Sequence, residues 1–175
     1  FFFHRHDQFW ERNAMLKLPE LLRSSGMLAC GEDLGMIPAC VPGVMQKLGI
    51  LSLEMPMMDK GRPWPQLSVC TTSSHDMDTL RMQNGESDLP AWECRNRIQG
   101  VLDSSSMLAI LPLQDWLSID GEHRRRDYKE ERINQPADPH HHWRYRMHLT
   151  LEELKSMSGF NAALEGLLKD SRRYC

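Results

Sequence analysis

The stretch from Met27 to Gly35 constrains the fold most, because a short apolar run, Met27-Leu28-Ala29-Cys30, stops abruptly at Gly31-Glu32-Asp33. A run of this length that ends in glycine and acid predicts a buried strand whose carboxyl end delivers carboxylates into a cleft. A second run, Leu67 to Thr71, ends in the same way at Ser74-His75-Asp76. Two such strand ends, one with a histidine beside the carboxylate, favour sugar chemistry at the mouth of a barrel.

Strand-like and helix-like segments alternate along the rest of the chain. The patterns predict strands over 27–30, 50–55, 67–71 and 107–111, and helices over 8–25, 41–48, 90–103 and 149–169. Thr150-x-x-Glu153 predicts a capping box at the start of the last helical region. Residues 120–146 are polar, charged and contain prolines, which predicts a long surface segment or lid. Strands separated by helices predict an α/β fold with parallel strands.

Charge and cysteine content exclude several classes of protein. A formal net charge of -3 over 175 residues gives no electrostatic reason to expect nucleic acid or an anionic membrane as a partner. No apolar run approaches the length of a membrane span. Five cysteines, an odd number without a pairing pattern, favour thiols in a reducing compartment over a disulfide framework, so we expect a cytoplasmic protein. The opening Phe1-Phe2-Phe3-His4, without an initiator Met, predicts the middle of a longer chain.

Cleaving a glycosidic bond with retention needs two carboxyl groups. One protonates the leaving oxygen and the other attacks from the opposite face, about 5 to 5.5 Å away. The acid must stay protonated near neutral pH, which requires a site with little water or with negative charge nearby. Glu32, beside Asp33 at the end of an apolar run, suits that role. Asp76 suits a stabiliser of the positive charge at the anomeric carbon, and His75 offers a ring N–H to the same sugar.

Each of these features also has a structural interpretation. Acidic pairs flanked by glycine are common turns, and a His-Asp pair is often a local hydrogen bond or half of a metal site. His140-His141-His142 invites a zinc interpretation, but three consecutive residues cannot easily face one ion, and no partner has ligand spacing. Four tryptophans could stack on sugars, although core packing is the default for each: Trp64, Trp92, Trp116 and Trp143.

Three motifs occur in order along the chain. They are Cys30-Gly31-Glu32-Asp33-Leu34-Gly35-Met36-Ile37-Pro38, then Ser74-His75-Asp76-Met77-Asp78-Thr79, then Glu131-Arg132-Ile133-Asn134-Gln135-Pro136 with Trp143-Arg144-Tyr145-Arg146. On these motifs the chain resembles the C-terminal part of the 4-alpha-glucanotransferases (amylomaltases or disproportionating enzymes) of glycoside hydrolase family 77. It is most similar to the longer bacterial and plant type that carries N-terminal starch-binding modules. The resemblance runs from about Phe1 to Leu154.

This resemblance implies the C-terminal half of a (β/α)8 barrel of the alpha-amylase clan, with residues 1–175 as a partial catalytic domain that holds about the fifth to eighth strands. It implies transfer of α-1,4-glucan units between maltooligosaccharides, with Glu32 as general acid/base and Asp76 as transition-state stabiliser. His75 and Asp33 would bind the substrate. The resemblance implies no metal and no organic cofactor.

Two departures from the family pattern bear on activity. The family's nucleophile is an aspartate of the fourth strand in an Arg-x-Asp-His context, and this motif does not occur in the chain. It would lie before Phe1. The acidic, tryptophan-rich stretch that usually follows the His-Asp motif is shortened, because Thr79-Leu80-Arg81 passes directly into Met82-Gln83-Asn84-Gly85.

Three functions follow as hypotheses. The first is a glucanotransferase of which this chain, inactive by itself, is a part. Its partners would be α-1,4-glucan or maltooligosaccharide substrates and the missing N-terminal part of the same enzyme. The second is a truncated or degenerate chain that only binds glucan or a partner chain. The third is a metal-dependent phosphohydrolase built on His75 and Asp76, which would need further ligands at helical spacing.

Overall fold

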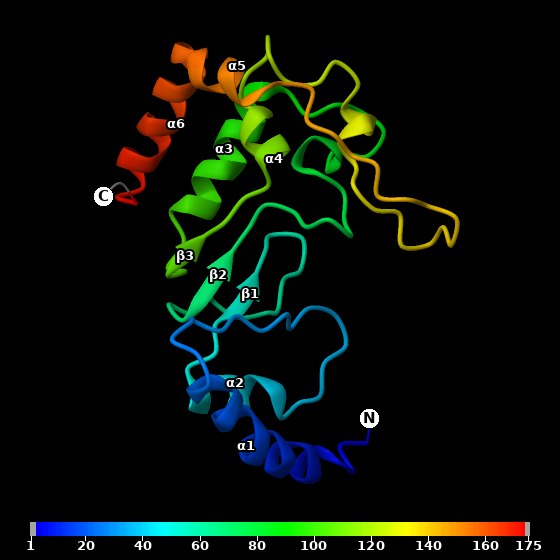
Figure 1. Ribbon diagram of the computed structural model, residues 1–175, viewed down its shortest axis with the longest axis vertical. Helices are drawn as coiled ribbons and strands as arrows, with labels where there is room; N and C mark the ends of the chain where they lie inside the picture. The colour runs from blue at the N-terminus through cyan, green and yellow to red at the C-terminus, as the bar shows by residue number, and fades with distance from the viewer. Residues whose placement is uncertain (1–2, 174–175) are drawn as a thin grey trace. The chain divides into compact units, whose positions relative to one another are not determined.

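The computed structural model describes residues 3–173 (Figure 1). The chain divides into two compact units, each of which we describe by itself. Unit 1 consists of Phe1–Cys70 and Ser105–Ala109, and unit 2 of Thr71–Ser104 and Ile110–Cys175.

Unit 1 is built on a three-stranded parallel sheet. Strand β1 (Ser52–Glu54) pairs with β2 (Ser68–Cys70), and β2 pairs with β3 (Leu108–Ala109), so the order in the sheet follows the order in the sequence. The strands are short, but they fall inside the predicted ranges. The parallel α/β architecture that the sequence predicts is confirmed.

The strand predicted over 27–30 is wrong. Only Cys30 forms a β-bridge, parallel to Leu51, through Gly31 N–H donating to the Leu51 carbonyl (2.8 Å) and Leu51 N–H donating to the Ala29 carbonyl (2.9 Å). The run is also not buried, since Met27 is 81% exposed. A regular strand needs successive bridges, and this segment makes only one with the described neighbours.

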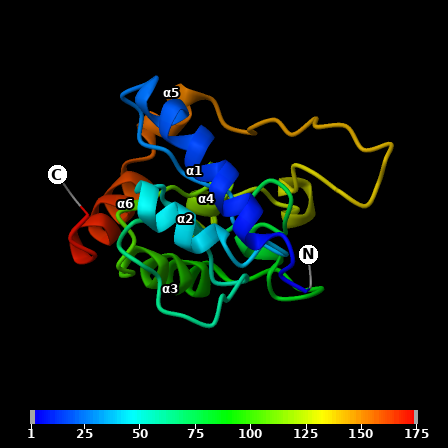
Figure 2. The same ribbon diagram turned by 90° about the horizontal axis from the view of Figure 1, so that it is seen from below.

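The helices of unit 1 lie close to their predicted ranges. Helix α1 (Asp7–Arg23) continues through Pro19, and it packs against α2 (Val41–Leu48), as Figure 2 shows. Pro42 lies in the first turn of α2, where a missing N–H costs little. Gly49 ends α2 in the left-handed conformation at φ +67°, a backbone state that glycine adopts without steric cost.

Unit 2 is mainly helical. Up to residue 173 it contains the 3-10 turns η1 (Leu80–Met82) and η2 (Tyr128–Glu131), and the α-helices α3 (Ala91–Leu102), α4 (Leu113–Leu117), α5 (Leu151–Ser156) and α6 (Ser158–Asp170). Helix α3 packs against α6. Between η2 and α5 the chain forms a long stretch without regular structure, visible in Figure 2. This stretch agrees with the predicted surface segment.

The predicted helical region over 149–169 is two helices, because the chain breaks at Met157. The Met157 side chain is buried with Leu117 and Phe160 in a small apolar cluster. The capping box of α5 is confirmed: Thr150 accepts from the Glu153 N–H at 3.2 Å, and the Glu153 carboxylate accepts from the Thr150 N–H at 2.7 Å. Trp116 also packs against this cluster, so it has the core role that is the default.

Two further findings bear on the class of protein. No helix among residues 3–173 combines the length and the apolar character that crossing a membrane requires. Within the same residues, Cys30, Cys40, Cys70 and Cys94 form no disulfide.

Candidate active site

Glu32 lies in unit 1, in the turn directly after the bridge at Cys30. Its side chain is exposed, and Oε1 accepts a hydrogen bond from the Leu34 N–H at 3.1 Å. Gly31 sits so close to α2 that an added Cβ would lie 2.8 Å from the Met45 terminal methyl. A side chain at position 31 would therefore meet Met45 of α2, whereas the Glu32 carboxylate is accessible. The role of Glu32 as general acid/base stays a prediction.

Asp33, the next residue in the chain, is buried instead of exposed. Its side chain is 3% exposed. Oδ1 accepts from the Leu53 N–H of β1 at 2.9 Å, and Oδ2 pairs with Lys60 at 2.7 Å. Lys60 in turn donates to the Leu53 carbonyl at 2.8 Å. Asp33 thus ties the Glu32 turn to the end of β1. Substrate binding by Asp33 stays a prediction, and both of its carboxylate oxygens are already engaged.

A second buried carboxylate in unit 1 escaped the sequence analysis. Glu54, at the end of β1, is 1% exposed and pairs with Arg62 at 2.9 Å and Lys60 at 3.5 Å. It also accepts from the Ser52 hydroxyl at 2.6 Å. Its Oε2 has no hydrogen-bond partner among the described residues. The charged loop between β1 and β2 therefore supplies two cations that offset Asp33 and Glu54.

His75 and Asp76 lie in unit 2, and both side chains are about half exposed, at 53% and 51%. His75 Nε2 lies 3.2 Å from an Asp76 carboxylate oxygen. The His75 ring also contacts the Trp143 ring, with centroids 5.0 Å apart and planes tilted by 47°. Trp143 is 61% exposed, so it is not a core residue. A carboxylate, an imidazole and an aromatic face thus adjoin one another at the surface.

The segment after η2 completes this arrangement. The Asn134 side-chain amide donates to Asp76 at 2.5 Å, and the Asn134 N–H donates to the His75 carbonyl at 3.2 Å. Arg132 forms an ion pair with Asp78. The second and third sequence motifs, separated by more than fifty residues, are therefore brought together around Asp76. Sequence reasoning named Asn134 only as part of a motif and gave it no role.

A buried carboxylate from α4 positions the His75-Asp76 segment. Asp115 is 1% exposed and accepts three hydrogen bonds: from the Thr72 hydroxyl at 2.6 Å, the Ser73 hydroxyl at 2.5 Å and the Leu80 N–H at 2.9 Å. Burial raises the pKa of the Asp115 carboxyl above its usual value, while the three donors act in the opposite sense. These bonds fix both ends of the loop that holds His75 and Asp76.

A charged cluster anchors the start of the third motif. Arg81, 1% exposed, pairs with Glu131 and with Asp88, and donates to the Arg125 carbonyl at 2.7 Å. Glu131 is 2% exposed, and burial raises the pKa of its carboxyl to about 7 although Arg81 lowers it. Glu131 directly precedes Arg132, so this cluster holds the segment that reaches Asp76.

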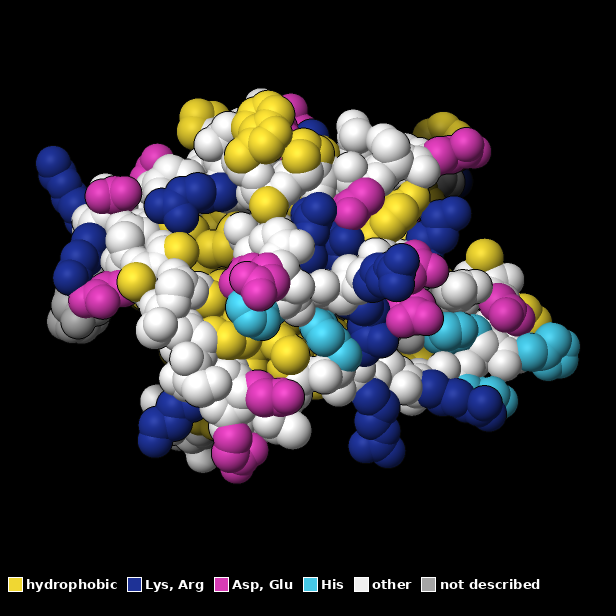
Figure 3. Space-filling view, turned by 90° about the horizontal axis from the view of Figure 1, so that it is seen from above, with side chains coloured by type: hydrophobic (Ala, Val, Ile, Leu, Met, Phe, Trp, Pro, Cys, Tyr) yellow, Lys and Arg dark blue, Asp and Glu magenta, His cyan; other side chains and the backbone are white. Residues whose placement is uncertain are grey.

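No metal-binding cluster emerges from the described part of the chain. Within residues 3–173, no group of three or more His, Cys, Asp or Glu side chains is placed to hold an ion. His141 instead contacts the Ile133 carbonyl at 2.8 Å through Nε2. On the face seen in Figure 3, histidines are spread among acidic and basic side chains.

These features define an α/β protein with a small parallel sheet in unit 1 and, in unit 2, an exposed group made of a carboxylate, a histidine and a tryptophan. The chain belongs to the 4-alpha-glucanotransferase family, glycoside hydrolase family 77, whose family model matches residues 2–151. The resemblance inferred from the motifs is confirmed.

Individual relatives agree with the family assignment. A 4-alpha-glucanotransferase DPE2 from rice (Oryza sativa subsp. japonica) is 38% identical over 201 aligned residues, which cover 99% of this chain and 21% of the rice protein. A 4-alpha-glucanotransferase from Chlamydia pneumoniae is 28% identical, over 86% of this chain and 34% of that protein. The chain thus spans between a fifth and a third of these relatives. The rice alignment is longer than the 175 residues of this chain, so that relative carries extra residues within the matched region.

A solved structure supports the fold. Amylomaltase from Streptococcus agalactiae in complex with acarbose superposes with a TM-score of 0.58 at 13% identity, over 82% of this chain and 31% of that one.

Proposed function

We propose that this chain is the C-terminal half of a (β/α)8 barrel, in which the Cys30 bridge segment, β1, β2 and β3 are about the fifth to eighth strands. The parallel pairing in sequence order supports this, because consecutive strands of such a barrel are neighbours. Apolar side chains left open on and beside the strands support it too: Leu67 and Met107 are each 43% exposed, and Leu108 is 38% exposed. The rest of a barrel would cover such positions.

The function that the site supports best is 4-alpha-glucanotransfer. We infer that the chain takes part in moving α-1,4-glucan segments between maltooligosaccharides or glucans by a retaining double displacement. The observation that carries this proposal is the meeting of Asp76 with His75, Trp143 and Asn134 in a chain of this family. An aromatic face beside hydrogen-bonding groups of both kinds suits a sugar ring, which has apolar faces and hydroxyl edges.

Each residue has a proposed role. Glu32, exposed on a fixed turn, protonates the leaving glycosidic oxygen and then takes the proton of the acceptor hydroxyl. Asp76 stabilises the positive charge that develops at the anomeric carbon, and Asn134 orients its carboxylate. His75 donates to a sugar hydroxyl. Asp33 positions Glu32 through its bonds to Leu53 and Lys60.

The double displacement also needs a nucleophile, and we propose that it is supplied by a segment outside these 175 residues, because the chain contains no Arg-x-Asp-His motif. That absence also favours the second candidate, a chain that binds glucan or a partner without turning it over. The two candidates differ in one measurement: whether glucose is released from maltotriose when the remaining part of the barrel is present.

The test is a chimera in which this chain replaces the matching region of the rice relative. We expect it to release glucose from maltotriose while it lengthens other chains. Asp76→Asn should reduce that transfer by roughly 10²-fold or more, since a preorganised charge in the transition state is lost. Asp170→Asn, an exposed change at the end of α6, is the matched control and should have no effect. Equal transfer by both variants would contradict the proposal.

A further inference from the structure

A pocket of about 540 Å³ in unit 2 is lined mainly by basic side chains. It lies between the segment around η2 and the segment that leads into α5. Its volume falls in the range of about 300 to 1,000 Å³ that is typical of ligand sites. We call it the arginine pocket, because its lining includes Arg125, Arg132, Arg144 and Arg146.

The charge of the arginine pocket is opposite in sign to that of the chain. The chain has a formal net charge of -3. The pocket gathers four arginines and three histidines around one carboxylate, Glu130, among the described residues. Guanidinium groups stay charged at physiological pH. The pocket therefore attracts anions, although the net charge of the chain gives no such attraction.

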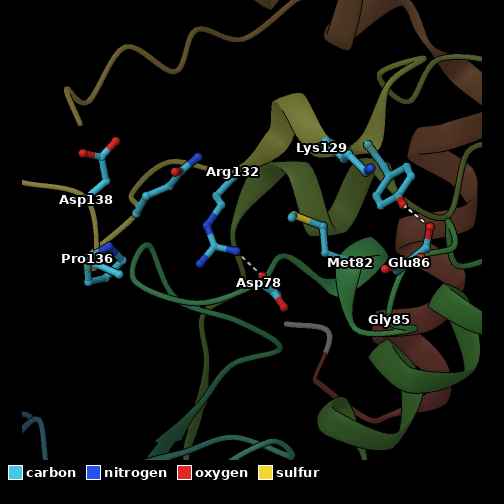
Figure 4. Close-up of a pocket in the computed structure, with 11 residues that line it drawn as sticks. Asp78, Met82, Gly85, Glu86, Lys129, Arg132, Pro136 and Asp138 are labelled. Carbon is cyan, nitrogen blue, oxygen red and sulfur yellow. Dashed lines mark hydrogen bonds and ion pairs between the residues drawn. The ribbon is translucent and has the colours of Figure 1, made fainter. Parts of the chain in front are cut away.

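Two of the four arginines already have partners. Arg132 also lines the pocket shown in Figure 4, where its guanidinium points toward Asp78 and pairs with it. Arg125 pairs with Glu130 at 3.0 Å, and its other terminal nitrogen donates to the Arg146 carbonyl at 2.5 Å. These two arginines are held in place and shape the pocket.

The other two arginines, Arg144 and Arg146, can bind a ligand. Both side chains are exposed, and within residues 3–173 neither has a carboxylate at ion-pair distance. Arg144, Arg146 and His148 are exposed, whereas Tyr145 and Met147 between them are half-buried. This period of two is that of an extended chain, in which alternate side chains point to the same side. Arg144 and Arg146 therefore present their charges together.

The wall that carries these arginines is fixed before any ligand binds. The Arg125 guanidinium carbon lies 5.6 Å from the centroid of the Tyr145 ring. The Tyr145 hydroxyl contacts the Met147 sulfur at 3.2 Å. His148 Nε2 donates to the His123 carbonyl at 2.8 Å, since a carbonyl oxygen can only accept. A wall held in this way loses little conformational entropy on binding.

We propose that the arginine pocket binds the phosphate group of a small molecule, either free phosphate or the phosphate ester of a sugar, through Arg144 and Arg146. A phosphate presents several charged oxygens, and the planar fork of one guanidinium bonds two of them at once. Two arginines side by side therefore suit a phosphate better than a carboxylate, whose two oxygens one arginine satisfies. The volume of about 540 Å³ leaves room for a sugar ring beside the phosphate. This inference does not rest on the proposed function.

The test uses the chimera with the rice relative, so that the arginine pocket is measured in a complete barrel. Titration calorimetry at low ionic strength, where screening is weak, gives the affinity for inorganic phosphate and for glucose 6-phosphate. Arg144→Gln/Arg146→Gln should weaken the binding of both probes by roughly tenfold or more, because charge-assisted hydrogen bonds are lost. Arg144→Lys/Arg146→Lys keeps the charges without the planar fork and should weaken binding less.

The matched control removes the same charge elsewhere in unit 2. Arg126→Gln/Lys155→Gln changes two exposed side chains that do not line the arginine pocket. It should leave both affinities nearly unchanged. Tighter binding of glucose 6-phosphate than of inorganic phosphate would identify a sugar ester as the ligand, and equal binding would show that the phosphate group alone is recognised.

Three results would overturn the proposal. If neither probe binds to the chimera, the arginines have other partners in the complete barrel. If binding survives in Arg144→Gln/Arg146→Gln, the probes bind elsewhere. If this variant and the control weaken binding equally, the attraction belongs to the net charge and not to the arginine pocket. None of these results bears on the proposed function, which is tested by transfer from maltotriose.

Discussion

Arg81 and Glu131 are separated by 50 positions in the sequence and form an ion pair inside unit 2, with side chains that are 1% and 3% exposed. Glu131 begins the segment that carries Arg132 and Asn134 to the His75-Asp76 loop. The pair therefore connects the stability of unit 2 to the geometry of the candidate site.

Removing one member of this pair should be costly. At pH 8, above the Glu131 pKa of about 7, Arg81→Met leaves the Glu131 carboxyl group buried without its cation, and breaking a buried pair in this way typically destabilises a protein by about 3 to 5 kcal/mol. The double variant Arg81→Met/Glu131→Leu should recover part of that loss, because the buried Glu131 carboxylate is gone and Asp88, the other partner of Arg81, keeps Arg124 at 3.3 Å. Urea unfolding measures both, with Arg126→Met, an exposed change, as control. Equal destabilisation by the single and the double variant would refute this account of the pair.

The same carboxyl should make stability depend on pH. Burial raises the pKa of Glu131 from 4.5 to about 7. Between pH 4.5 and pH 7, therefore, the folded state keeps a proton on this carboxyl group that the unfolded state has released. The contribution of this proton to the free energy of unfolding is fully present below about pH 4.5 and is lost as the pH rises through about 7. Its upper limit is on the order of 3 kcal/mol. The free energy of unfolding should therefore fall from pH 5 to pH 8. In Glu131→Gln this slope should be shallower, and an unchanged slope would assign the dependence to other groups.

Asp115 should control the loop that holds His75 and Asp76. Asp115→Ala leaves the Leu80 N–H and two hydroxyls buried without their acceptor, which we expect to cost about 2 to 4 kcal/mol. Asp115→Asn keeps one acceptor oxygen and should cost less. In the chimera, Asp115→Ala should also weaken transfer at temperatures where the protein remains folded. Wild-type stability and transfer in Asp115→Ala would show that the loop does not depend on this carboxylate.

Asp33 should act on Glu32 through the backbone. Asp33→Ala removes the acceptor of the Leu53 N–H and the partner of Lys60, so the Glu32 turn loses its connection to β1. We expect a loss of about 2 to 3 kcal/mol in stability, together with a lower kcat for transfer. A sugar-binding role would instead raise KM and leave stability nearly unchanged. The comparison of kcat, KM and unfolding free energy separates these two roles.

Much of the fold could be predicted from local patterns. Pro42 and Gly49 mark the ends of α2 because their backbone preferences are intrinsic, and the Thr150–Glu153 capping box depends on residues only three apart. The segment over 27–30 could not be judged in this way. An apolar run indicates that a strand formed there would be buried against neighbouring strands or helices. It does not indicate whether such neighbours are present.

The candidate site also contains some residues that local sequence patterns identify and others that they do not. His75 and Asp76 could be chosen because they end a strand-like run, and the structure adds Trp143 and Asn134 as their neighbours. Asp115 and Arg81 could not be chosen, since the partners that connect them to the site, Leu80 and Glu131, lie 35 and 50 positions away. Glu32 and Asp33 look equivalent in sequence. Only the fold separates them, by exposing the first and burying the second.

The most direct measurement compares two donors in the chimera that carries Glu32→Gln. With maltotriose, transfer should fall by roughly 10²- to 10⁴-fold, because the leaving sugar oxygen needs a proton. With α-maltosyl fluoride as donor, formation of the glycosyl-enzyme should survive, because fluoride leaves without protonation. The exposed change Glu122→Gln should affect neither donor. Full transfer from maltotriose by Glu32→Gln, or equal loss with both donors, would contradict the assignment of Glu32 as general acid/base.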